Sequence, residues 1–195
     1  MIDFDNSQAR INEIFYLLTS RGSGAYYGEE VTQLEHALQA AHHAVNTTDS
    51  EEIILAALLH DIGHLLEEEE PLGHQDHDRL GGAYLNKMGF SDTLIQLVTN
   101  HVKAKRYLVA TDLNYRDKLS EASKQTLVLQ GGPMTKEEVA AFEAEEYFDD
   151  MILIRLCDEQ AKDPQMQVMG LEHYRPMLER HLKQNQENYT YAKDN

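Results

Sequence analysis

The chain has 195 residues, of which 42% are hydrophobic. This length suffices for one sizeable core, and we expect a single domain over residues 1–195. Acidic side chains number 34 against 17 lysines and arginines, and the formal net charge of −17 argues against a nucleic acid or an anionic membrane as the main partner. The single cysteine, Cys157, excludes an internal disulfide and is typical of a reducing compartment. No segment has about 18 uninterrupted apolar residues, and the first residues lack a leader pattern. We therefore expect a cytoplasmic protein without a membrane span.

Helical spacing of apolar residues runs through most of the chain. Before residue 67 it predicts helices over residues 11–19, 31–45 and 51–66, the last one almost entirely apolar. Neither strand-like alternation nor a βαβ rhythm occurs, so we expect an all-α helical bundle. The sequence carries no signal for an oligomeric state. The helices expected further along cover residues 76–88, 93–101, 135–142, 151–162 and a polar segment after 172.

Short polar residues and glycines mark the ends of these helices. Asp49 or Ser50 is expected to cap the central helix. Gly89 is expected to end the helix over residues 76–88. Asp149 or Asp150 is expected to cap the helix over 151–162.

His60 and Asp61 are adjacent at the end of the apolar run over residues 53–59. A buried imidazole and carboxylate cost folding free energy unless something binds them. Neighbours on a helix point about 100° apart, so each side chain could face a different metal ion, with the carboxylate bridging both. His64 follows on the same face, one turn further along, and could lie beside the metals or contact the substrate.

Four further residues of ligand type flank this pair, each near the hydrophobic stripe of its own expected helix, as a site between bundle helices requires. Nitrogen and oxygen ligands without a thiolate suit iron, manganese or zinc, and the sequence alone does not choose among them. His74 could replace His77, which we prefer because it should lie within a helix. The four residues are His36, His77, His101 and Asp158.

Lys105 and Arg155 are the cations expected beside the metals. Lys105 is one helical turn beyond His101, and Arg155 is three residues before Asp158. They could form an anion site in an otherwise acidic chain. The alternative is that both are ordinary solvent-facing cations.

Five segments resemble a known family. They are Tyr26-Tyr27-Gly28-Glu29 and residues 33–36, 57–64, 100–108 and 130–134. Through them most of the chain resembles the HD-domain superfamily, and within it the mixed-valence diiron oxygenases, most closely those that cleave phosphonates. Most HD proteins are phosphohydrolases with fewer histidines, and some HD phosphodiesterases also hold two metals. Lys105 and the Gln-Gly-Gly-Pro-Met stretch at 130–134 distinguish the oxygenase branch.

The resemblance implies a ligand set and a substrate site. One iron would be held by His36, His60, Asp61 and Asp158, and the other by Asp61, His77 and His101. Tyr26 would occupy an iron position at rest and leave when substrate binds, while Glu29 would face the cationic end of the substrate. The phosphonate would be held by His64, Lys105, Ser123 and Arg155. Tyr26, Glu29 and His64 are thus the expected catalytic residues.

The resemblance also implies a reaction, in which a mixed-valence Fe(II)/Fe(III) pair uses O2 as co-substrate and breaks a C–P bond to release phosphate. Two hydroxyphosphonates fit: 2-amino-1-hydroxyethylphosphonate, giving glycine, and (R)-1-hydroxy-2-(trimethylammonio)ethylphosphonate, giving glycine betaine. A quaternary ammonium favours an aromatic or anionic lining, so the aromatic Tyr27 favours the second. An HD-type metal-dependent phosphohydrolase is the alternative enzyme. A non-catalytic HD module is a further alternative, but the sequence suggests no second domain that would receive its signal.

Overall fold

The computed structural model describes residues 7–26, 28–66 and 76–193, with side chains described up to residue 188. These residues are mainly helical and form no strand, only an isolated bridge between Ala25 and Thr32. The all-α prediction is confirmed. The α-helices are α1 (Ser7–Tyr16), α2 (Gln33–Val45), α3 (Glu51–Leu59), α4 (His77–Lys87), α5 (Asp92–Thr111), α6 (Leu113–Lys118), α7 (Glu121–Leu129), α8 (Lys136–Glu143), α9 (Phe148–Gln160) and α10 (Arg175–Lys193). A π-helical turn covers Leu17–Arg21, and 3-10 turns cover Ile62–Leu65 and Leu171–His173.

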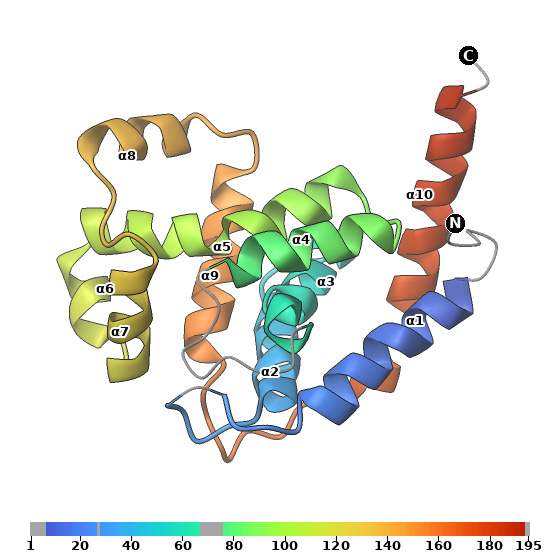
Figure 1. The fold of residues 1–195 in the computed structure, drawn as a ribbon, viewed down its shortest axis with the longest axis horizontal. Helices are drawn as coiled ribbons and strands as arrows, with labels where there is room; N and C mark the ends of the chain where they lie inside the picture. Colours follow the sequence, from blue (N-terminus) through green and yellow to red (C-terminus); the bar gives the residue numbers. More distant parts are fainter. Residues whose placement is uncertain (1–6, 27, 67–75, 194–195) are drawn as a thin grey trace.

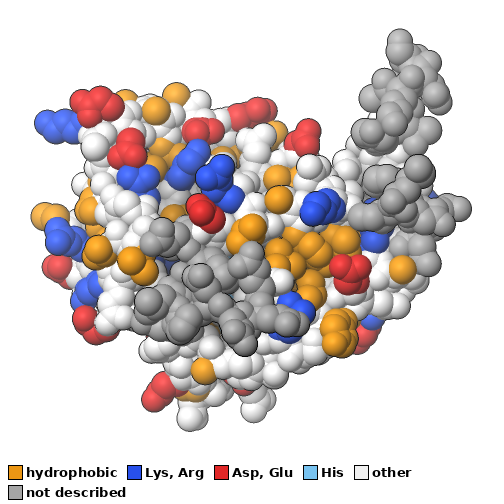
Figure 2. Space-filling view, in the orientation of Figure 1, with side chains coloured by type: hydrophobic (Ala, Val, Ile, Leu, Met, Phe, Trp, Pro, Cys, Tyr) orange, Lys and Arg blue, Asp and Glu red, His pale blue; other side chains and the backbone are white. Residues whose placement is uncertain are grey.

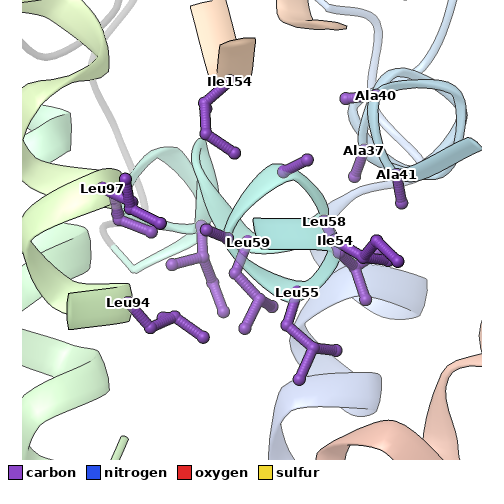
Figure 3. Packing of buried hydrophobic residues seen from close by; sticks show 14 of the residues in the cluster. Ala37, Ala40, Ala41, Ile54, Leu55, Leu58, Leu59, Leu94, Leu97 and Ile154 are labelled. Carbon is purple, nitrogen blue, oxygen red and sulfur yellow. The ribbon is translucent and has the colours of Figure 1, made fainter. Parts of the chain in front are cut away.

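Helix α3 is the centre of the bundle, and α2, α5, α9 and α10 pack around it (Figure 1). Its residues 53–59 are all buried, as an apolar helix without a polar face requires. The Ser50 hydroxyl accepts from the amide of Ile53, so the predicted cap is confirmed. Figure 3 shows leucines of α3 between the small alanines of α2 and the leucines of α5. This packing holds the end of α3 in a fixed place.

The central helix ends earlier than predicted. It stops at Leu59, His60 is its C-cap residue, and Asp61 leaves the helical conformation (φ −101°, ψ 11°) before the 3-10 turn Ile62–Leu65. Gly63 in that turn lies directly against α4, since a Cβ there would come within 1.9 Å of the carbonyl oxygen of His77. Close packing on α4 therefore overrides the helical propensity of the sequence.

Other helix bounds also differ from the predictions. Helix α5 continues ten residues past 101 to Thr111, which places Lys105 and His101 on one helix. The cap predicted for α9 is wrong, because Tyr147 is the N-cap residue and Asp149 lies inside the first turn. The glycine end of α4 agrees with the prediction, since Gly89 follows the C-cap residue with φ 81°.

The surface and the described helices can be compared with the composition. None of the described helices combines the length and the apolarity needed to span a membrane. On the face drawn in Figure 2, acidic and basic side chains are interspersed, and no broad basic surface is visible. Helices α1 and α10 lie side by side (Figure 1) and are tied by hydrogen bonds from Arg175 to Gln8 and Asn12.

Replacing Leu55 by Ala should lower the free energy of unfolding by about 2–5 kcal/mol, because it opens a cavity in the middle of α3. Leu55 has no exposed surface. The urea midpoint should fall with an unchanged slope. Val128→Ala is the control, because Val128 is 76% exposed and its truncation should change stability by less than about 0.5 kcal/mol. Equal effects of the two substitutions would contradict this account of the core.

Candidate functional site

Five segments of the bundle deliver the predicted metal ligands to one place. Helices α2, α4, α5 and α9 supply one side chain each, and the end of α3 supplies two adjacent ones. All six side chains are buried, with at most 7% of any residue exposed. We call these residues the His-Asp cluster: His36, His60, Asp61, His77, His101 and Asp158.

The carboxylate of Asp61 lies between two pairs of histidines. Its Oδ2 atom is 3.6 Å from Nε2 of His36 and 3.4 Å from Nε2 of His60. Its Oδ1 atom is 3.3 Å from Nε2 of His77 and 3.4 Å from Nε2 of His101. Each oxygen therefore faces a different pair, which is the geometry of a carboxylate that bridges two cations.

Backbone carbonyls determine the tautomers of three of these histidines. Each of the three places Nδ1 2.7–2.8 Å from a carbonyl oxygen, so Nδ1 donates to that carbonyl, and Nε2 faces the cluster and offers a lone pair to a metal ion once it is deprotonated. The three pairs are His36 with Ala161, His60 with Ala57, and His101 with Val98.

These lone pairs converge on each other. The Nε2 atoms of His36 and His60 are 3.1 Å apart, and those of His77 and His101 are 3.0 Å apart. Asp61 Oδ2 and Asp158 Oδ1 are buried among the described residues without a hydrogen-bond donor. Unsatisfied buried oxygens and facing lone pairs cost free energy that a bound cation would remove. The donor set therefore fits metal ions.

The ligand atoms form two groups that could each hold an ion. One contains His36, His60 and Asp158, and the other contains Asp61, His64 and His77. The short contacts of His101 to Asp61 and His77 place it with the second group.

The electrostatics of the cluster favour positive charge. Burial alone would lower the pKa of His60, but the carboxylates of Asp61 and Asp158 outweigh it and raise that pKa to about 9. Burial would raise the pKa of Asp61, yet His60 and the other histidines hold it well below its usual range. The pKa of Asp158 is likewise held well below its usual range, against burial, chiefly by Arg155. A negative potential at these atoms attracts a cation.

Two aromatic rings flank the cluster. The ring of Tyr26 stacks on His36 with centroids 4.0 Å apart, which brings it to the edge of the cluster. Burial and the Asp61 carboxylate raise the pKa of Tyr26. The ring of His64 stacks on His77 with centroids 3.9 Å apart, and burial together with His77 lowers the pKa of His64 to about 3. His64 is therefore neutral at physiological pH.

The two predicted cations are buried beside the cluster. Lys105 and Arg155 are each 4% exposed, so the solvent-facing alternative is wrong for both. Arg155 is ion-paired with Asp158 and Glu159, and its Nε donates to the hydroxyl of Tyr115 at 2.6 Å. These contacts raise the pKa of Arg155, although burial opposes them. Arg155 therefore stays charged and fixed in orientation.

Lys105 reaches from α5 to α7. Its Nζ donates to Thr126 Oγ1 at 2.7 Å and to Gln130 Oε1 at 3.1 Å. Burial and repulsion from Arg155 lower its pKa to about 7. Gln130 begins the predicted turn, and the φ angles of 95° and 71° at Gly131 and Gly132 agree with it.

Glu29 and Ser123 meet at a lysine that sequence reasoning missed. Oε1 of Glu29 accepts from the Ser120 hydroxyl at 2.6 Å and lies 3.5 Å from Nζ of Lys162. Lys162 in turn donates to Ser123 Oγ at 3.1 Å. The helix predicted over residues 151–162 placed Lys162 one turn after Asp158, a spacing that could have indicated it, although α9 itself ends at Gln160. Tyr27, considered as an aromatic group near the substrate, and His74, the alternative ligand to His77, lie outside the described residues.

Comparison with known proteins agrees with this geometry. A model of the HD domain matches residues 33–147, more than half of the chain. The chain belongs to the HD-domain family. A [1-hydroxy-2-(trimethylamino)ethyl]phosphonate dioxygenase (glycine-betaine-forming) of Leisingera caerulea is 42% identical to it over 165 residues, covering 82% of this chain and 84% of that protein. A hydroxymethylphosphonate dioxygenase of Gimesia maris is 39% identical over 176 residues, covering 87% of each chain.

A third relative has no assigned activity. The uncharacterized protein L432 of Acanthamoeba polyphaga mimivirus is 38% identical over 184 residues, covering 91% of this chain and 84% of that protein. Together these matches confirm the resemblance predicted from the sequence. This HD-domain protein belongs to the branch that contains the phosphonate dioxygenases.

Replacing Asp61 by Ala should reduce the bound metal to fewer than one ion per chain, because both ion positions lose a ligand at once. Metal analysis of the purified, folded protein measures this, with circular dichroism as the check on folding. Asp150→Ala is the matched control, since this partly buried carboxylate lies in the first turn of α9, away from the cluster. An Asp61→Ala protein that kept two ions would rule out the bridging geometry.

Proposed function

We propose that this HD-domain protein is an O2-dependent diiron oxygenase that cleaves the C–P bond of a hydroxyphosphonate. The position of the Asp61 carboxylate carries this proposal. Each of its two oxygens faces a different pair of histidines, so the carboxylate could bridge two metal ions. The buried cations Lys105 and Arg155 beside it supply the anion site that a phosphonate needs. The names of two relatives support oxygenase chemistry rather than hydrolysis.

In this proposal two irons share the His-Asp cluster. One is held by His36, His60, Asp61 and Asp158, and the other by Asp61, His77 and His101. A mixed-valence Fe(II)/Fe(III) pair would supply the one-electron chemistry with O2 that hydrolysis does not need. The chain itself would bind the substrate, orient its hydroxyl-bearing carbon and limit the access of water through the partly buried rings of Tyr26 and His64.

The phosphonate end of the substrate is assigned to His64, Lys105, Ser123 and Arg155. Arg155 is held by Tyr115 and two carboxylates, so it can donate without reorganising. Lys105 is held by two neutral oxygens, which an anionic phosphonate oxygen could replace to form a stronger, charge-assisted bond.

The cationic end of the substrate is assigned to Glu29. The amide of Glu29 donates to the carbonyl of Tyr26 at 2.9 Å, and Gly28 between them has φ 72°. Because this turn ties the backbones of Tyr26 and Glu29 together, we propose that their side chains move together. A substrate cation that attracts the carboxylate of Glu29 would thereby help Tyr26 to leave the metal position that we assign to it at rest.

We propose (R)-1-hydroxy-2-(trimethylammonio)ethylphosphonate as the substrate, with glycine betaine and phosphate as products. The 42% identity to an enzyme named for that reaction supports it, as does the anionic Glu29, which shares a turn with the aromatic Tyr26. 2-Amino-1-hydroxyethylphosphonate, giving glycine, is the close alternative. An HD-type phosphohydrolase is the remaining one, since a binuclear site also suits hydrolysis.

Phosphate release from the trimethylammonio substrate should occur only when iron and O2 are both present. The aerobically purified protein should contain about two irons per chain and show a paramagnetic mixed-valence signal on partial reduction. Zinc-loaded protein, as the control, should release no phosphate, because zinc does not change oxidation state. Turnover of a phosphate ester without O2, or with zinc, would instead support the hydrolase.

The kcat/KM for the phosphonate should fall as the pH rises through about 7, because the ammonium of Lys105 loses its proton there. Below that pH Lys105 is charged and attracts the anion, and above it the attraction is lost. In Lys105→Arg, kcat/KM should not fall between about pH 6 and pH 9, since arginine stays charged. Lys105→Met should lower kcat/KM by about tenfold or more at pH 6.

These variants also control for the ionisation of the substrate, which is the same for every protein tested. A fall at pH 7 that persists in Lys105→Arg would therefore belong to the substrate or another group, and would contradict the role of Lys105.

A further inference from the structure

Lys162 is the charged group next to the candidate site to which the proposed reaction gives no role. It follows the end of α9, and only 13% of its side chain is exposed. Its Nζ lies 2.9 Å from Glu159 Oε1, 3.1 Å from Ser123 Oγ and 3.5 Å from Glu29 Oε1. An ammonium has three protons to donate, and these three oxygens can take all of them.

The contact with Glu29 puts Lys162 in the place of a substrate cation. Both the hydroxyl of Ser120 and the ammonium of Lys162 approach the same oxygen, Oε1. The Glu29 side chain is 13% exposed, so solvent screens its charge only partly. A trimethylammonium group brought to Glu29 would meet a like charge already there.

We propose that Lys162 is a specificity-determining residue: its ammonium occupies Glu29 in place of a cationic substrate end and narrows the preference for the trimethylammonio substrate over hydroxyphosphonates that lack a cationic end. This inference rests on the proposed function. Hydroxymethylphosphonate has no cationic end and leaves the Lys162 to Glu29 pair intact. For the trimethylammonio substrate, Lys162 has to leave Glu29 and keep only Glu159 and Ser123 as acceptors.

A different role for Lys162 predicts a different result. Through Ser123 it also borders the residues assigned to the phosphonate, and its charge contributes to the lowered pKa of Lys105. If Lys162 served the phosphonate end, its loss would weaken both substrates equally, because both carry the same phosphonate. The ratio of the two kcat/KM values therefore separates the roles.

The experiment compares kcat/KM for the trimethylammonio substrate and for hydroxymethylphosphonate in iron-loaded wild type, Lys162→Met and Lys162→Arg. Lys162→Met keeps much of the length of the side chain without its charge, and should raise the ratio of the trimethylammonio to the hydroxymethyl value about tenfold. Lys162→Arg keeps the charge and should retain a ratio close to that of wild type. Iron content and thermal unfolding check that each variant is loaded and folded.

A second measurement tests whether Lys162 acts through Glu29. In a Glu29→Gln background the carboxylate is gone, so Lys162→Met should no longer change the ratio. An unchanged ratio in Lys162→Met, an equal loss for both substrates, or a shift that persists without Glu29 would each overturn the inference. Wild type that released phosphate from neither substrate would overturn the proposed function, and the inference with it.

Discussion

The carboxylate of Asp61 imposes the constraint on which the rest of the structure depends. Its two oxygens face separate pairs of imidazole nitrogens, at 3.3–3.6 Å, and these pairs come from four elements of the bundle. The structure satisfies this with α3 ending at Leu59 and Asp61 outside the helical conformation. Gly63 permits that stop by letting the 3-10 turn lie against α4. The end of one helix thus determines where both ion positions lie.

The cluster is costly and the surrounding core offsets that cost. Asp61 Oδ2 and Asp158 Oδ1 are buried without donors among the described residues, and such atoms oppose folding. The apolar run of α3 next to them is buried on every side (Figure 3), so the same segment supplies both a large hydrophobic gain and the most unfavourable polar groups. The rule that buried polar atoms have hydrogen-bond partners fails at these atoms, as is expected at a site that binds a ligand.

The sequence predicted which polar side chains come together better than it predicted the helix ends, and the difference has a physical reason. His36 and His101 could be found because a buried stripe at helical spacing is a local pattern, and a histidine within it stands out. The early end of α3 depends on Gly63 touching α4, and the full length of α5 on packing around Lys105. Both are long-range contacts. Lys162 was missed although it lies one turn after Asp158 in the predicted helix, because its contact with Glu29 joins segments far apart in the chain.

The charges around the cluster are arranged in alternation, and this order can select the orientation of a substrate. The carboxylates of the His-Asp cluster are followed by the cations Arg155 and Lys105, and the far side is closed by Lys162 and Glu29. In the proposed binding mode, a small molecule with its anion at Arg155 and its hydroxyl at the His-Asp cluster would direct its remaining substituent at Glu29. Because Lys162 already contacts that carboxylate, the last pair of charges decides how well a cationic substituent is received. In a chain with 34 acidic residues, position rather than net charge makes the anion site.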